Sequence, residues 1–373
     1  MKKTLSLLCI LALCAGCSGS RVKFEPYVIE NLEPKPEFWK VRPDEIISVC
    51  RDVRVGRSEI IARTPGGYPV YAVFYGDFSE PAPQTNWSAG NSSSAKSAYL
   101  GQTDHKPTIL LYAGVHGSEC EPVAALCNMI RLLETGRDFR GVEDPEFAEL
   151  CGHYRLIIVP CVNMDGRSIT PDHLRAQPYE VFRGCSQGWW KDGSLVGWRA
   201  SKEWFPLPLD KVKFPGGYTN ADGYNIQHDA APGNTRTEEA KAIYRLAERW
   251  RVDFALNCHS CEGGAFIIRP SNISTDWNLE RGTQLADMVN AAFRESGLNP
   301  RAPITQKPNE TINLTTTLPL CCGGLSLTLE CCHCCYNEDG HINLLSFERM
   351  MEPPFVAMKL IMRDGLDRPL ANR

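Results

Sequence analysis

The spacing of apolar residues changes character near residue 108 of the chain. Before that point, residues 55–77 alternate apolar and polar positions around Gly66 and Gly67, which predicts a β-hairpin. Residues 81–107 contain Pro, Ser, Asn and Gly with few apolar positions, so we expect a surface loop there. The hairpin and the loop therefore precede the main body of the fold.

From residue 108 onward, continuous apolar runs alternate with amphipathic segments. Continuous apolar runs are typical of strands buried on both faces, and a period near 3.6 residues is typical of helices. Alternation of this kind predicts an α/β fold with a mixed, mostly parallel central sheet and helices on both faces. The expected strands are residues 108–115, 155–162, 252–258, 265–269 and 325–330, and the expected helices are residues 122–134, 237–250, 279–296 and 344–363.

One long segment, residues 167–224, has no clear period. A structureless segment of this length inside a compact domain is usually functional. We therefore expect it to contribute to a binding site.

Three of the predicted strands lead into side chains that can bind a metal or move a proton. One buried run ends in front of His116 and Glu119, a later run ends in front of His259, and the last run ends in Glu330. Each residue alone has an ordinary structural alternative, such as a helix cap, a core histidine or a salt bridge. Because sites in open α/β sheets gather beyond the carboxyl ends of the strands, the four side chains together predict one site.

Four short motifs, taken in order, resemble those of the M14 zinc carboxypeptidase family. The resemblance extends over residues 45–362 and implies a zinc carboxypeptidase-like α/β/α fold, with one catalytic domain over residues 45–365. The motifs are His116-Gly-Ser-Glu119, Pro160-Cys-Val-Asn163-Met-Asp165-Gly166, Asn257-Cys-His259-Ser260 and Thr328-Leu-Glu330.

The resemblance implies one zinc ion held by His116, Glu119 and His259. Two imidazoles and one carboxylate leave the fourth zinc position open, as a catalytic site requires. Water bound there becomes a nucleophile near neutral pH, and Glu330 would act as the general base. The expected activity is hydrolysis of a peptide or amide bond, which makes a peptide or amide the expected substrate.

The family also implies an arginine that stabilises the oxyanion, located in the interval that follows the Asn163 motif. Four arginines lie in that interval: Arg167, Arg175, Arg183 and Arg199. We expect Arg183, in Val-Phe-Arg-Gly, to hold this role. Arg199, which follows a tryptophan, is the next candidate and an expected substrate-binding residue.

The sequence departs from the family where a substrate carboxylate is bound. Gln227 and His228 stand where an Asn-Arg pair is expected, and residues 300–329 contain no tyrosine. A histidine cannot present the planar fork of an arginine to a carboxylate. Either the substrate lacks a free α-carboxylate at this point, which we favour, or another arginine from residues 167–199 replaces the missing one. His228 would then contact a neutral polar group or respond to pH.

Two further functions stay open. The same zinc chemistry serves amide deacylases related to the family, and a cell-wall peptide amidase is a variant of that alternative. A lipoprotein that binds peptides or metal without turnover is the alternative of another class, although the complete set of ligands and base favours an enzyme. The net charge of −4 and the absence of a clustered basic segment argue against a nucleic-acid partner.

The N-terminus predicts export. Lys2 and Lys3 precede an apolar run over residues 5–15, which is typical of a secretory signal and shorter than the about 20 residues of a membrane-spanning helix. The following Cys17 resembles the acylated cysteine of bacterial lipoproteins. We therefore expect a signal peptide over residues 1–17, a tether over residues 18–44, and a lipid anchor in the membrane. Ser18 favours the outer membrane.

Cysteine is abundant, with 17 residues in the chain. If Cys9 and Cys14 leave with the signal and Cys17 carries lipid, 17 − 3 = 14 remain, and an even number in an exported protein permits disulfides. The segment 331–335 contains four cysteines around one histidine. A second metal site is possible there, but we favour disulfides or buried thiols.

Overall fold

The computed structural model describes residues 22–372, except 81, 102–105, 231–232 and 304–309. The expected signal peptide and the expected lipidation site, Cys17, lie outside the described residues. Among the described residues, no helix is both long enough and apolar enough to cross a membrane.

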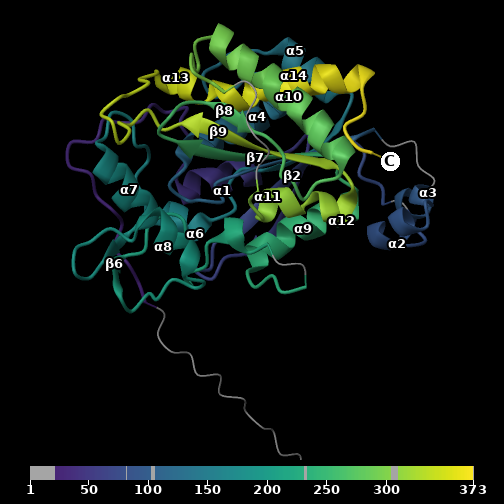
Figure 1. The fold of residues 1–373 in the computed structure, drawn as a ribbon. Helices are drawn as coiled ribbons and strands as arrows, with labels where there is room; N and C mark the ends of the chain where they lie inside the picture. Colours follow the sequence, from purple (N-terminus) through teal and green to yellow (C-terminus); the bar gives the residue numbers. More distant parts are fainter. Residues whose placement is uncertain (1–21, 81, 102–105, 231–232, 304–309, 373) are drawn as a thin grey trace, which may run out of the picture.

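A seven-stranded mixed sheet runs through the molecule (Figure 1). The four central strands β4, β3, β7 and β9 are parallel, while β2 and β8 join them antiparallel and β1 pairs antiparallel with β2. The predicted fold class is therefore confirmed. In spatial order the strands are β1 (Arg57–Arg63), β2 (Pro69–Tyr75), β4 (Arg155–Val159), β3 (Thr108–Ala113), β7 (Phe254–Cys261), β9 (Leu325–Cys332) and β8 (Phe266–Ile268).

Successive side chains of the central strands enter two separate cores, because neighbouring residues of a strand point to opposite faces. Leu111 belongs to the core that contains α1, α4, α10 and α14, and Leu110 belongs to the core that contains α9, α11 and α12. Figure 1 shows α10 and α14 on one side of the sheet and α9, α11 and α12 on the other. Burial on both faces explains the continuous apolar runs of the sequence. The helix bounds are α1 (Pro43–Arg51), α4 (Cys120–Thr135), α9 (Glu238–Trp250), α10 (Asp276–Glu295), α11 (Leu314–Thr317), α12 (Pro319–Cys322) and α14 (Glu352–Asp367).

The two segments expected to be irregular contain short elements. The first holds α2 (Trp87–Ser92) and α3 (Lys96–Leu100), where the Asn86 side chain caps α2 and the rings of Trp87 and Tyr99 pack at 5.4 Å. Helices this short give no readable period, so the loop prediction for residues 81–107 was wrong there. The same reason applies to residues 167–224, which contain α7 (Tyr179–Gln187), α8 (Gly197–Glu203), and the two-stranded sheet of β5 (Trp189–Trp190) and β6 (Val212–Phe214).

The remaining short elements flank longer ones. The α5 helix (Pro145–Cys151) precedes β4, α6 (Met164–Ser168) follows it, and η1 (Ile226–His228) precedes α9. The helix predicted over residues 344–363 is divided into α13 (Phe347–Met350) and α14, because Pro353 and Pro354 open a new helix after Met351.

Part of the predicted tether packs against the domain. Trp39 and Val41 are fully buried in the core that holds α4, and the Trp39 Nε1 donates to the backbone oxygen of Asp172 at 2.9 Å. The backbone N–H of Tyr27 also bonds the carbonyl of Ile169 at 2.8 Å. These contacts fix residues of the segment 22–42 to the region that follows α6.

Candidate metal centre and the cleft around it

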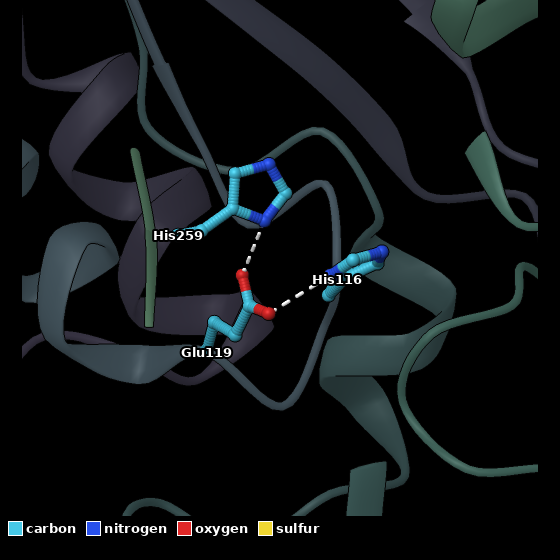
Figure 2. Close-up of side chains that lie close together, drawn as sticks. All are labelled: His116, Glu119 and His259. Carbon is cyan, nitrogen blue, oxygen red and sulfur yellow. Dashed lines mark hydrogen bonds and ion pairs between the residues drawn. The ribbon is translucent and has the colours of Figure 1, made fainter. Parts of the chain in front are cut away.

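Figure 2 shows His116, Glu119 and His259 with both imidazoles turned towards one carboxylate. The Nδ1 atoms of His116 and His259 each lie 2.8 Å from a different oxygen of Glu119. The three side chains are almost fully buried, and one candidate ligand atom of each lies within 4.8 Å of the others. The structure therefore brings the three predicted ligands together.

The loop that carries His116 is fixed by close backbone packing. Gly117 donates its N–H to the carbonyl of Gly217 at 2.6 Å, and a Cβ on Gly117 would lie only 2.1 Å from the backbone nitrogen of Arg167. Asn163 secures the opposing turn, because its side chain caps α6 through the N–H of Gly166 and donates to the carbonyl of Gly217. The Asn163 motif thus supports the metal-binding loop.

The electrostatics of Glu119 and His116 suit a divalent cation. Burial opposes ionisation of Glu119, but His116 and His259 outweigh it and lower the pKa of the carboxyl to about 2. Burial also lowers the pKa of His116, which favours the neutral imidazole that metals bind. Ligand atoms around a tetrahedral zinc stand about 3.4 Å apart, so small shifts from the observed spacing would accommodate the ion. The triad is positioned to bind one zinc ion.

Two residues that sequence reasoning did not single out hold His116 in place. The side-chain oxygen of Asn225 lies 3.2 Å from the His116 Nε2, and the ring of Tyr218 stacks on the imidazole with a centroid distance of 3.9 Å. A partner on the second imidazole nitrogen fixes the tautomer of a metal-bound histidine. The signal for Asn225 was its place at the start of the run that contains Gln227 and His228.

Glu330 lies beside the triad on the next strand. It pairs with His259 in the register of β7 and β9, and both residues line one cleft of about 370 Å³. Burial raises the pKa of Glu330 to about 8, so this carboxyl can exchange a proton near neutral pH. The structure therefore places the predicted base next to the predicted metal ligands.

Gln227 and His228 also line this cleft. Both polar ends of the Gln227 side chain are engaged, since its oxygen accepts from Asn257 at 2.9 Å and its nitrogen donates to Thr315 at 3.4 Å. Burial lowers the pKa of His228 to about 3, so the imidazole stays neutral between pH 5 and 8. The partly buried position of His228 disfavours the charged form, and a response of this residue to pH stays a prediction.

The structure separates the two leading arginine candidates. Arg183 lines the cleft, where its guanidinium bonds the Tyr179 hydroxyl at 3.1 Å and lies 5.5 Å from the centre of the Tyr179 ring. Arg199 does not line the cleft: its side chain is 91% exposed and its nearest acid is Glu203 at 3.8 Å. A contact between Arg199 and the substrate stays a prediction, and α8 turns this side chain to solvent.

The other two arginines of the interval serve the fold. Arg167 is fully buried, donates to the carbonyl of Thr170 at 2.6 Å and also contacts Pro171 and the thiol of Cys120. Arg175 donates to the carbonyl of Leu345 at 2.8 Å and pairs with Glu33 at the surface. Neither guanidinium lines the cleft.

The cysteine-rich segment supplies buried thiols. The fourteen cysteines of the described residues are all free, which agrees with the preferred interpretation of residues 331–335. His333 lies in this segment and pairs with Glu121 at 3.1 Å in the interior. Within the part of the chain that the structure describes, His116, Glu119 and His259 form the one group suited to hold a metal.

Comparison with known proteins agrees with this site. A family model described as zinc carboxypeptidase (M14) matches residues 60–281. A metallo-carboxypeptidase from Burkholderia cenocepacia is 17% identical at a TM-score of 0.53, covering 86% of this chain and 68% of its own. A putative carboxypeptidase from Burkholderia mallei is 17% identical at a TM-score of 0.56, and the match covers 92% of this chain and 70% of the Burkholderia mallei chain.

A metallo-carboxypeptidase from Pseudomonas aeruginosa, solved with (2-guanidinoethylmercapto)succinic acid, is 15% identical at a TM-score of 0.53, covering 92% of this chain and 70% of its own. At such identities the solved structures establish the fold alone. None of the curated proteins compared with the sequence is a match. The family model covers more than half of the chain and spans all three metal-binding residues, His116, Glu119 and His259. The chain therefore belongs to the M14 zinc carboxypeptidase family.

Proposed function

We propose that the chain is a zinc-dependent hydrolase of peptide or amide bonds in which Glu330 is the general base. The observation that carries this proposal is the position of Glu330, opposite His259 in the β7–β9 ladder and on the wall of the same cleft. A carboxyl with a pKa near 8 beside a metal centre is suited to acid–base chemistry. A protein that only binds a metal has no use for such a group.

The residues of the cleft would have different roles in the reaction. When bound, zinc would supply Lewis acidity and would lower the pKa of water at the site. Glu330 would accept a proton from that water and deliver it to the leaving nitrogen. Arg183, whose guanidinium faces the cleft from α7, would stabilise negative charge on the substrate oxygen.

An amide deacylase or a cell-wall peptide amidase is the second candidate. It is favoured by the state of two cleft residues, because Gln227 is bonded on both polar ends and His228 is neutral. Neither can provide the fork that binds a free carboxylate well. Substrates with and without a free C-terminal carboxylate therefore belong in the same assay.

The test is Glu330→Gln, assayed on a panel of peptide acids, peptide amides and N-acyl amides. The substitution keeps the shape of the side chain and removes the proton acceptor. We expect turnover to fall by about 10²–10⁴-fold while the zinc content stays unchanged. Glu203→Gln, on an exposed side chain, makes the same chemical change away from the cleft and should have no effect. Normal turnover in Glu330→Gln would remove Glu330 from the mechanism.

We also propose that the protein is exported and anchored by lipid on Cys17. The support is the short apolar run before Gly16 and Cys17 in the sequence. Mass spectrometry of the protein purified from membranes should find an acylated Cys17 as the first residue. A free N-terminus at another position would overturn this proposal.

A further inference from the structure

A row of aromatic rings leads from the metal centre to a lysine on α8. Tyr218 stacks on His116, and Trp198 packs edge-on against Tyr218 with a centroid distance of 5.6 Å. The Lys202 Nζ lies 3.6 Å from the centre of the Trp198 ring. Trp198 and Lys202 are both on α8, one helical turn apart, and both line the cleft. The row therefore places an ammonium group on the cleft wall near the metal ligands.

This ammonium group has no acidic partner within the described residues. The neighbouring acid on α8, Glu203, is directed to Arg199 at 3.8 Å instead. Lys202 is partly buried, and burial lowers its pKa, with no carboxylate acting in the opposite direction. Lys202 and His228 both line the cleft, and the charge of Lys202 also helps to lower the pKa of His228.

A partly buried cation without a partner is costly for the folded protein, and a bound anion would relieve that cost. The contact with Trp198 stabilises a cation but leaves its N–H groups free to donate to a ligand. A carboxylate is the anion that a peptide or a peptide-like substrate carries. The chemistry of this wall is therefore matched to a negatively charged substrate group.

We propose that Lys202 is a specificity residue that binds a carboxylate of the substrate, on the side of the cleft formed by α8 and His228. This inference rests on the proposed hydrolase function and names the substrate class of that site. The sequence suggested an arginine from residues 167–199 as the replacement for the missing carboxylate-binding arginine. The structure offers a lysine three residues beyond that interval. The carboxylate has two possible sources, the C-terminus of the substrate or an acidic side chain.

Three substrates distinguish these sources. The first is an N-acylated dipeptide with a C-terminal alanine and a free carboxylate, and the second is the same dipeptide with a C-terminal amide. The third is the C-terminal amide with glutamate in place of alanine. We expect Lys202→Met to raise KM at least tenfold for whichever of the two carboxylate substrates is preferred, with a smaller change in kcat. Lys202→Arg should keep most of the preference. Lys211→Met is the matched control, because Lys211 is exposed, lies 5.7 Å from the Trp204 ring and is outside the cleft.

A binding measurement on zinc-free protein separates this inference from the proposed function. N-acetylalanine, the α-amide of N-acetylglutamate and N-acetylalaninamide are titrated by NMR, so that both sources of the carboxylate are compared with a neutral amide and no metal can attract the carboxylates. Tighter binding of either carboxylate compound that is lost in Lys202→Met supports the inference even if no substrate is hydrolysed, an outcome that would count against the hydrolase. The inference is overturned if wild-type protein prefers neither carboxylate compound over N-acetylalaninamide, or if folded Lys202→Met keeps the preference, whatever the turnover.

Discussion

The two walls of the cleft are built in different ways. One wall consists of strand ends, where His259 and Glu330 are paired in the β7–β9 ladder and Glu119 opens α4. The other wall consists of the short elements α7, α8 and η1, and Figure 1 shows α7 and α8 beside the end of the sheet to which β9 points. Glu119 and His259 of the first wall are almost fully buried, whereas Trp198 on the second is 40% exposed. The metal ligands and Glu330 lie on the first wall, the strand-end wall, whereas Arg183, Trp198 and Lys202 lie on the second, the short-element wall. Side chains held by the sheet and side chains held by short helices therefore meet in one cleft.

The largest effect is expected where the loop of the strand-end wall packs against the backbone of α6. In Gly117→Ala the new Cβ would lie 2.1 and 2.2 Å from backbone atoms of Arg167 and Gly166, which cannot move without displacing α6. We expect a loss of about 3 kcal/mol in the free energy of unfolding, together with weaker zinc binding. Urea unfolding and metal analysis measure the two effects. Gly263→Ala, where the nearest atom is 3.9 Å away, should behave as wild type, and equal stability of the two variants would contradict this packing account.

On the short-element wall, Arg183 is the residue for which we expect a loss of turnover. In Arg183→Met, kcat should fall about 100-fold with little change in KM, because the guanidinium would act on charge that develops during the reaction. Arg199→Met makes the same change on a side chain that is 91% exposed and should leave both constants unaltered. If Arg183→Met instead raises KM alone, Arg183 binds substrate and another group stabilises the oxyanion.

The smallest effect concerns His228 and the pH dependence of stability. The pKa of His228 is lowered to about 3 in the folded protein and is near 6.5 in an unfolded chain. Below pH 6.5 the unfolded chain takes up a proton that the folded protein does not, so His228 reduces stability by about 1 kcal/mol per pH unit as the pH falls. His228→Gln should therefore lose less stability than wild type between pH 7 and pH 5. Parallel unfolding curves over this range would show that His228 titrates normally.

The strand-end wall could be predicted from the sequence, because the geometry of a parallel sheet places the residues that follow neighbouring apolar runs side by side. The apolar run of β7 ends at His259 and that of β9 at Glu330, and parallel register places the two side by side. The loop of His116 and Glu119 follows β3 by the same logic. Burial on both faces made these strands readable as apolar runs without any structural information.

The short-element wall could not be predicted in the same way, and the reason is physical. The elements α7 and α8 have nine and seven residues, too few for a clear period. Without a helix phase, the sequence could not show that α8 turns Lys202 to the cleft and Arg199 to solvent. Lys202 also lacks the planar fork of an arginine, so its type did not mark it as a carboxylate-binding residue in the sequence.

The central claim is that the ends of β3 and β7 form one zinc centre, and zinc stoichiometry tests it without knowledge of the substrate. Wild-type protein, His259→Ala and the exposed-site control His341→Ala are stripped of metal, titrated with zinc and analysed after removal of free ions. The account predicts one tightly bound zinc per chain in wild type and in His341→Ala, and loss of most of it in His259→Ala. Full zinc retention in folded His259→Ala would contradict the account.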